Sequence, residues 1–214
     1  MAPKPILYQI DESPPVKTVK MLAKALDLEL ELKTVDLMNK EQYTSEYLKI
    51  NPVHTVPTLD DNGVIIWDSH AILIYLVDKY AKNDSLYPKD FVKRTIVNQL
   101  LFLETSIFNK LIGVLKQIFF GKENEITDSQ KESIVDSFES IERILEGKKF
   151  LGGQEVTIAD ISLLTTLTAG DVVDLKKFTK IAYWLKNMEA LPFFESNASA
   201  IKIDAKVIKT YTSL

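Results

Sequence analysis

The sequence changes its pattern once, between residues 82 and 88, and this change constrains the fold more than any other feature. Before it, short apolar runs rich in strand-forming residues alternate with stretches whose apolar residues recur at helical spacing. After it, only helical spacing is found. The segment Lys82–Pro88 itself is polar and ends in proline, as linkers do. We therefore expect an α/β domain over residues 1–81, a linker over 82–89 and an all-helical domain over 90–214.

The expected elements of the first domain follow the order β-α-β-α-β-β-α, which suits an α/β unit with a mixed sheet. Strands are expected over 5–10, 28–35, 55–59 and 64–67, and helices over 14–26, 40–49 and 69–80. Asp60-Asp61-Asn62-Gly63 joins the last two strands and favours a hairpin turn. In the second domain, helices are expected over 90–119, 128–146, 157–169, 177–190 and 193–211.

Composition excludes several classes of protein. The formal net charge is −4, which leaves no evident cationic surface for nucleic acid. The chain has no cysteine, so it can form neither disulfides nor a cysteine-based metal site, and it has no cysteine nucleophile. No apolar run reaches the roughly 18–20 residues of a membrane span, and the first residues lack the apolar region of a signal peptide. We expect a soluble protein of the cytoplasm.

Ser13 stands where the first strand pattern meets the first helical pattern, directly before Pro14-Pro15. Serine is a preferred N-cap residue, and proline is favoured at the first helical position. The Ser13 hydroxyl is therefore expected at the positive end of a helix dipole, where it could meet an anion such as a thiolate.

The segment Asn51-Pro52-Val53-His54-Thr55-Val56-Pro57 places a proline at the start of a strand pattern. Proline cannot donate to a sheet ladder, and an X-Pro bond in such a tight approach can be cis. A cis bond would turn the backbone groups of Val56 outward and offer an edge to an extended peptide ligand. The alternative is an ordinary turn proline without a ligand.

Asp68-Ser69-His70 begins the third helical pattern. We expect Ser69 to cap this helix, and its free backbone N–H groups to be able to bind a carboxylate. Asp68 could pair with an amine, so that the two together would suit an α-amino acid group. A plain helix cap without a ligand is the alternative.

Thr157-Ile158-Ala159-Asp160 reads as a capping box. We expect Thr157 to accept from the Asp160 N–H, and the Asp160 carboxylate to reach back to Thr157. Its role is structural, at the start of a buried helix that organises the second domain.

Other functional motifs lack support. His54 and His70 are the only histidines, too few for a metal site in a chain without cysteine or a carboxylate pattern such as HExxH. The chain has no G-x-S-x-G nucleophile elbow, no G-x-G-x-x-G motif and no P-loop. The apolar stripe over 100–118 is expected to be mainly core, although part of it could line a pocket between the domains.

Taken together, these motifs resemble the cytosolic glutathione transferases of the insect delta/epsilon type. Five of them stand in family order at family spacing over nearly the whole chain, and the Asp-Ser-His triplet is closer to the epsilon class. The matching pieces are Ser13-Pro14-Pro15-Val16, Asn51-Pro52-Val53-His54-Thr55-Val56-Pro57, Asp68-Ser69-His70-Ala71-Ile72, Leu86-Tyr87-Pro88-Lys89-Asp90 and Thr157-Ile158-Ala159-Asp160.

The resemblance implies a thioredoxin-like domain that binds glutathione as cosubstrate, a helical domain that supplies most of the electrophile pocket, and no metal. Ser13 would donate to the glutathione sulfur, Val56 would pair with the cysteinyl part, and the γ-glutamyl and glycyl ends would lie against other residues of the first domain. The implied glutathione site comprises Gln42, His54, Thr55, Val56, Pro57, Asp68, Ser69 and His70. The implied electrophile pocket comprises Pro15, Met38, Phe108, Leu111, Leu115 and Phe119.

Two positions depart from the family pattern. Gln42 stands where members often have a histidine near the glycyl carboxylate. The stretch Glu104–Phe120 has no arginine, where many epsilon enzymes carry one. We therefore expect an apolar pocket that prefers neutral electrophiles to those with an anionic tail.

The function expected from the resemblance is conjugation of the glutathione thiolate to small apolar electrophiles, as in detoxification. The alternative is a non-catalytic carrier of apolar ligands on the same fold. A homodimer that meets through the third and fourth helices is expected in either case.

Overall fold

The computed structural model describes residues 3–120, 127–167 and 177–194, with the backbone alone for 115–120. The first part of the chain forms a four-stranded sheet of order β2-β1-β3-β4. β1 (Ile6–Gln9) pairs in parallel with β2 (Glu31–Thr34) and antiparallel with β3 (Thr58–Asp61), which pairs antiparallel with β4 (Val64–Trp67). Its helices are α1 (Pro14–Ala25), the 3₁₀ helix η1 (Glu41–Tyr43), α2 (Ser45–Ile50) and α3 (Ser69–Tyr80).

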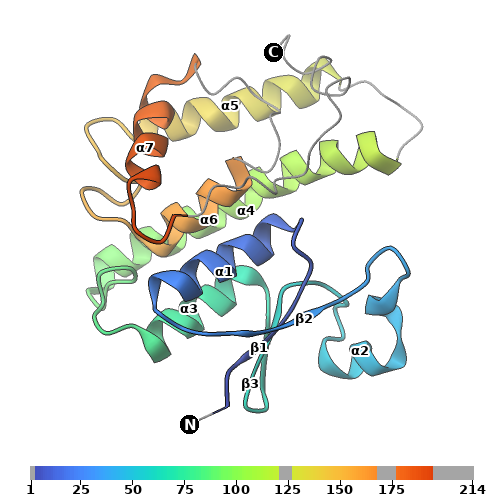
Figure 1. The fold of residues 1–214 in the computed structure, drawn as a ribbon. Helices are drawn as coiled ribbons and strands as arrows, with labels where there is room; N and C mark the ends of the chain where they lie inside the picture. The colour runs from blue at the N-terminus through green and yellow to red at the C-terminus, as the bar shows by residue number, and fades with distance from the viewer. Residues whose placement is uncertain (1–2, 121–126, 168–176, 195–214) are drawn as a thin grey trace.

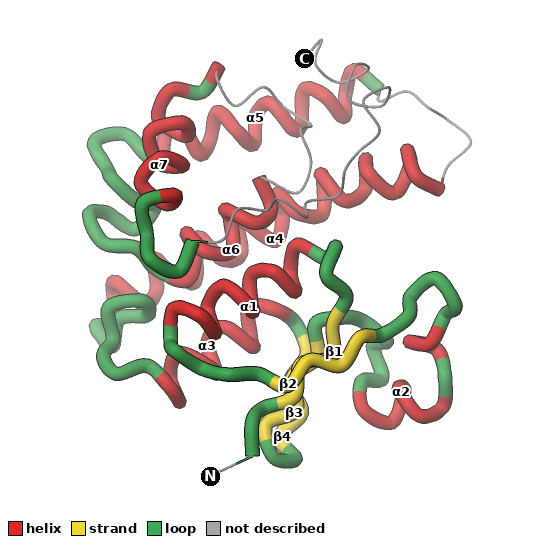
Figure 2. The backbone as a smooth tube through the Cα atoms, viewed as in Figure 1, coloured by secondary structure: helices red, strands yellow, loops and turns green. Residues whose placement is uncertain are grey.

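Within the described residues, the regular elements of the second part of the chain are all helices, joined by turns and one isolated β-bridge. It comprises α4 (Phe91–Phe120), α5 (Asp128–Ile144), α6 (Ile158–Leu167) and α7 (Thr179–Glu189). α1 and α3 lie between the sheet and the helices α4 and α6, so that the two halves of the chain meet along these four helices (Figure 1; Figure 2). The expected fold class, a thioredoxin-like domain followed by a helical one, is confirmed. None of the helices within the described residues combines the length and apolar composition needed to cross a bilayer.

Three expected elements of the first domain differ from the structure, and the first is the strand expected over 28–35, which covers only Glu31–Thr34. The helix expected over 40–49 begins only after Lys40, whose φ of 61° is left-handed. It is split into η1 and α2 by Thr44, whose backbone is extended and whose side chain caps α2 by accepting from the Tyr47 N–H. The strand expected over 55–59 begins only at Thr58, after Pro57, which has no N–H for a ladder bond. In the second domain, the helix expected over 193–211 falls from residue 195 onward outside the described residues.

The hairpin between β3 and β4 is tighter than expected. Asp60 and Asp61 belong to β3, and only Asn62 and Gly63 form the loop, with φ values of 55° and 89°. Two successive positive φ values are typical of a type I′ turn, which an Asn-Gly pair favours.

The carboxylate of Asp61 fastens this hairpin to α3. Its Oδ2 accepts from Lys79 Nζ at 2.6 Å, from the Tyr80 hydroxyl at 2.6 Å and from the Tyr75 hydroxyl at 2.9 Å. Burial by itself would raise the pKa of Asp61, but these hydrogen bonds lower it to about 2. Lys79 gains the complementary effect: its hydrogen bond to Asp61 raises the pKa of the ammonium group.

α6 is buried along its whole length and is positioned by Asp160, which is 0% exposed. The Asp160 carboxylate accepts from the N–H and hydroxyl of Thr157, both at 2.9 Å, from the Leu151 N–H at 2.7 Å and from Trp184 Nε1 at 2.9 Å. Burial raises the pKa of Asp160, and the four hydrogen bonds oppose that rise. Only half of the expected capping box is present, because the Thr157 hydroxyl donates to Asp160 and the Asp160 N–H bonds the Thr157 carbonyl instead.

A complete capping box begins α5, at a position that the sequence analysis did not single out. Thr127 accepts from the Gln130 N–H at 3.2 Å, and Gln130 Oε1 accepts from the Thr127 N–H at 2.9 Å. Thr-x-x-Gln before a helical pattern is the signal that would have predicted it.

Candidate active site

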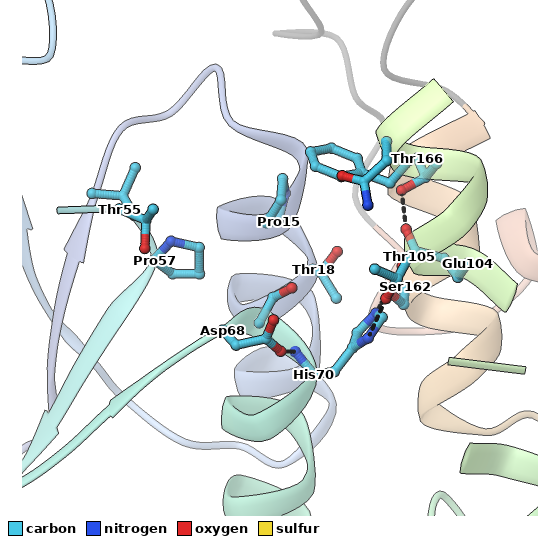
Figure 3. Close-up of a pocket in the computed structure, with 14 residues that line it drawn as sticks. Pro15, Thr18, Thr55, Pro57, Asp68, His70, Glu104, Thr105, Ser162 and Thr166 are labelled. Atoms are coloured by element: carbon cyan, nitrogen blue, oxygen red, sulfur yellow. Dashed lines mark hydrogen bonds and ion pairs between the residues drawn. The ribbon is translucent and has the colours of Figure 1, made fainter. Parts of the chain in front are cut away.

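A cavity of about 210 Å³ lies where the two halves of the chain meet. Its N-terminal wall is formed by Thr55, Val56, Pro57, Asp68, Ser69 and His70, and its helical wall by Glu104, Thr105, Phe108, Asn109, Ser162 and Thr166. Pro15 and Thr18 of α1 lie between the two walls (Figure 3). The cavity therefore draws on segments that are as much as 151 residues apart in sequence, from Pro15 to Thr166.

Ser13 caps α1 in position but not by a side-chain bond. It is the N-cap residue, with φ −73° and ψ 119°, and its hydroxyl makes no capping hydrogen bond. Two prolines follow it, and because proline has no N–H, the first turn of α1 offers few donors to a capping oxygen. The half-buried Ser13 hydroxyl therefore stays uncommitted among the described residues, two positions before the cavity-lining Pro15.

The peptide bond between Val56 and Pro57 is cis, as expected. The turn before it is held by Asn51, which is 0% exposed and whose Nδ2 donates to the Thr55 carbonyl at 3.0 Å and to Thr58 Oγ1 at 2.9 Å. Among the described residues, neither the N–H nor the carbonyl of Val56 is used in a backbone hydrogen bond. An edge for an extended peptide is therefore present on the N-terminal wall.

Tyr47 supports the same turn from α2. Its hydroxyl donates to the Thr55 carbonyl at 2.7 Å and lies 3.2 Å from Thr58 Oγ1. Burial raises the pKa of the Tyr47 phenol, which keeps it protonated and able to donate.

Asp68, not Ser69, caps α3. Its Oδ1 accepts from the N–H groups of His70 at 2.9 Å and Ala71 at 3.2 Å, and its φ of 73° lies in the left-handed region. The expectation that Ser69 caps this helix is wrong, because both residue types cap well and the backbone here places Asp68 at the cap position. Two of the N–H groups expected to be free are thus taken by Asp68, whose Oδ2 accepts no hydrogen bond from the residues that the structure describes.

His70 joins the N-terminal wall to the helical wall. Its Nε2 lies 2.7 Å from Glu104 Oε2 and 2.8 Å from Ser162 Oγ, while Nδ1 lies 3.3 Å from Thr105 Oγ1 (Figure 3). Glu104 is only 5% exposed, and its Oε1 accepts from the Thr166 hydroxyl. This connected group of polar side chains crosses from α3 to α4 and α6.

Sequence reasoning placed His70 at the site but missed its partners. Glu104 lies four residues after Leu100 on the face of α4 that the apolar stripe predicts to be buried. A carboxylate on a buried helix face needs a hydrogen-bonding or charged partner, so the position of Glu104 in the sequence could have predicted one. Ser162 and Thr166 gave a weaker signal, as polar residues in a helix that is mostly apolar.

The remaining predicted site residues fall into three groups. Pro15 and Phe108 line the cavity. Gln42, His54, Met38 and Leu111 are not among its lining residues: Met38 is 79% exposed, Leu111 is buried in the core, and His54 stacks at 4.7 Å on the ring of Tyr43. The side chains of Leu115 and Phe119 lie outside the described residues.

Gln42 carries a buried side-chain oxygen, Oε1, that has no hydrogen-bond partner among the described residues. Buried polar atoms are nearly always hydrogen-bonded, so Gln42 Oε1 is suited to accept a hydrogen bond from a ligand.

Within the described residues, no three His, Asp or Glu side chains lie close enough together to hold a metal ion.

Comparison with known proteins agrees with this geometry. Residues 3–78 match the glutathione S-transferase N-terminal domain, and residues 100–192 match the glutathione S-transferase C-terminal domain. Glutathione S-transferase D7 of Drosophila melanogaster is 38% identical over 210 residues, which covers 95% of this chain and 92% of that protein. The chain therefore belongs to the glutathione S-transferase family.

Solved structures place it more closely within the family. An epsilon-class enzyme from the housefly, Musca domestica, is 42% identical with a TM-score of 0.89, covering 99% of this chain and 100% of that one. A delta-class enzyme from Nilaparvata lugens is 32% identical with a TM-score of 0.88, covering 97% and 100%. A homolog from Drosophila mojavensis with bound glutathione is 41% identical with a TM-score of 0.88, covering 98% of both chains. The chain is an insect-type glutathione transferase closer to the epsilon class, as its Asp-Ser-His triplet predicts.

Proposed function

We propose that this enzyme transfers the thiolate of glutathione to small, mainly apolar electrophiles. The observation that carries the proposal is the uncommitted Ser13 hydroxyl at the start of α1, beside a cavity whose N-terminal wall offers the backbone of Val56. The family match and the related structure with bound glutathione support glutathione as the cosubstrate.

Glutathione would lie along the N-terminal wall. The Val56 N–H and carbonyl would pair with the cysteinyl part, next to Thr55 and Pro57. Asp68, with its Oδ2 still available, would take the γ-glutamyl amine, and Ser69 the carboxylate beside it. At the opposite end, His54 and Gln42 would approach the glycyl part, where the unpartnered Gln42 Oε1 is suited to accept a peptide N–H.

The chemistry at Ser13 follows from the acidity of the thiol. A free thiol has a pKa near 8.5, so only a few per cent is thiolate at neutral pH. A hydrogen bond from the Ser13 hydroxyl and the positive end of α1 both favour the anion, whereas partial burial opposes it. The nucleophile is the sulfur of glutathione, and no protein side chain has to act as a general base.

The electrophile would bind between α1 and the helical wall, at Pro15 and Phe108. The resemblance adds Leu115 and Phe119, whose side chains lie outside the described residues, while Met38 and Leu111 do not line the cavity. The presence of the Glu104 carboxylate in the cavity lining supports a preference for neutral electrophiles over carboxylated ones, because like charges repel at short range.

The active form is proposed to be a cytoplasmic homodimer. Apolar side chains are exposed on β4 and on the first half of α4, and a second copy of the chain would cover them. These side chains are Val64, Ile65, Trp67, Phe91, Val92, Ile96 and Phe102. The proposal keeps a glutathione-binding domain over 1–81, a linker over 82–89 and a helical domain over 90–214, with no nucleic acid or membrane as partner.

A steady-state assay with glutathione and chlorodinitrobenzene tests the proposed reaction. We expect turnover, a lower kcat/KM for a carboxylated analogue of the electrophile, and a dimer in sedimentation at micromolar concentration. Glutathione binding without turnover of any electrophile would favour the alternative, a carrier of apolar ligands.

A further inference from the structure

One polar side chain on the helical wall is not part of the hydrogen-bonded group around His70. Asn109 lies on α4, is exposed, lines the cavity and directly follows Phe108. Its carboxamide makes no hydrogen bond to any of the residues that the structure describes. A carboxamide carries two N–H donors, so Asn109 presents uncommitted donors to the space where the electrophile is proposed to bind.

The other polar groups of this wall are already bonded. The hydroxyls of Thr105, Ser162 and Thr166 have partners either in their own helix or in the pair that His70 forms with Glu104. Of the buried Glu104 carboxylate, Oε2 lies beside His70 and Oε1 accepts from Thr166. Among the described residues of the helical wall, therefore, Asn109 is the side chain whose donors are left for a ligand.

We infer that, given the conjugation proposed above, Asn109 is a catalytic residue for electrophiles that carry an oxygen acceptor conjugated to the attacked carbon. Nitroarenes and α,β-unsaturated carbonyl compounds are the two classes that fit. In both, negative charge collects on an oxygen in the transition state. A preorganised N–H donor at that oxygen lowers the barrier, because its bond is stronger to the transition state than to the ground state.

The electron movements define which oxygen is stabilised. In a chloronitroarene the sulfur–carbon bond forms first, and an electron pair passes through the ring to a nitro oxygen. That pair returns as the carbon–chlorine bond breaks and chloride leaves. In an unsaturated aldehyde the sulfur bonds the β-carbon, the π pair moves onto the carbonyl oxygen, and water then supplies the proton that the α-carbon takes up. The Asn109 N–H groups would donate to the nitro or carbonyl oxygen.

An alkyl halide without such an oxygen gives the matched comparison. In benzyl chloride the sulfur displaces chloride in one step, and no charge collects on an oxygen. The same cavity and the same thiolate serve all three reactions, so only the role of the oxygen differs between them.

The test compares kcat/KM of wild type, Asn109→Leu and Asn109→Asp for chlorodinitrobenzene, an unsaturated aldehyde and benzyl chloride at saturating glutathione. Leucine keeps the size of asparagine and removes the donors, while aspartate keeps its shape and offers only acceptors. In Asn109→Leu we expect a loss of roughly 3- to 10-fold for the two oxygen-bearing electrophiles and little change for benzyl chloride. Asn109→Asp should lose more on the same two electrophiles, because a negative charge then faces the developing one.

Glutathione affinity and thermal unfolding, measured on each variant, keep the comparison free of folding effects. An equal change for all three electrophiles, or no change for any, overturns the role of Asn109 while leaving the proposed function intact. A wild-type protein inactive toward all three electrophiles overturns the proposed function, and the role of Asn109 with it.

Discussion

The two walls of the cavity are built in different ways. The N-terminal wall is held by short-range structure: a cis peptide, a turn closed by Asn51 and a cap formed by Asp68. The helical wall is held by side chains that meet across long stretches of sequence, as His70 meets Glu104 and Ser162. The part proposed to bind glutathione thus depends on contacts within a few residues, and the part proposed to bind the electrophile depends on contacts between distant segments. Substitutions on the helical wall can change the electrophile range without disturbing the cosubstrate.

Breaking the support of the helical wall should have the largest effect. Asp160→Ala leaves buried donors at Thr157, Leu151 and Trp184 without an acceptor, and should destabilise the protein by about 3–5 kcal/mol. Denaturant unfolding measures this loss of stability. Asp128→Ala, at a carboxylate that is 96% exposed on α5, is the control and should change stability little. A loss below about 1 kcal/mol in Asp160→Ala would show that α6 does not depend on this carboxylate.

Ser13→Ala should have the next largest effect, on chemistry rather than on folding. Loss of a hydrogen bond worth about 1.5–3 kcal/mol to the thiolate should raise the pKa of the bound thiol by about 1–2 units. Turnover at neutral pH should fall roughly 10- to 100-fold. Glutathione affinity should change much less, because the N-terminal wall holds the rest of the tripeptide. Ultraviolet titration of the bound thiolate measures the shift.

The same variant separates catalysis from capping. Since the Ser13 hydroxyl makes no capping bond, the cost to stability should lie below the roughly 1 kcal/mol of a lost N-cap. A folded, glutathione-binding Ser13→Ala protein whose thiol titrates at the wild-type midpoint would refute the catalytic role.

Asn51→Ala tests the N-terminal wall, and with it whether the two walls act independently. It removes the side chain that closes the turn before Val56, and should raise the KM for glutathione roughly 10-fold, because the backbone edge is no longer held in place. The KM for the electrophile should stay near its wild-type value. Asn83→Ala, which removes an exposed asparagine in the linker, serves as the matched control. If both substrates are affected equally in Asn51→Ala, the two walls are not independent.

The smallest effect is expected from Asp61, as a dependence of stability on pH in the acid range. Its folded pKa of about 2 lies below the usual 3.8, so the folded state favours the ionised form. The stability that this carboxylate contributes is therefore fully present above about pH 4 and is lost as the pH falls through that range toward 2. In Asp61→Asn, the midpoint temperature of thermal unfolding should fall less steeply than in wild type as the pH decreases. Asp27→Asn, at a carboxylate that is 83% exposed, should leave this pH dependence unchanged.

Most of the N-terminal wall could be predicted from sequence. Proline restricts φ and removes a donor, so Pro14 marks the start of α1 and Pro57 marks a break before β3. Asn62-Gly63 specifies its turn because few other pairs adopt two positive φ values. The cap of α3 was assigned to the wrong neighbour, since Asp68 and Ser69 are equally good caps and only the backbone path selects one of them.

What the sequence by itself determined is the set of local structures: the starts of α1 and α3, the Asn-Gly turn, the break in the strand at Pro57 and the change to an all-helical pattern. Each depends on φ restrictions and hydrogen bonds within a few residues. Tertiary structure alone decided that His70 meets Glu104, that Trp184 donates to Asp160, and that Asn109 lines the cavity while Met38 does not. Those contacts depend on how each helix is rotated and crossed against its neighbours, which is set by packing over the whole core.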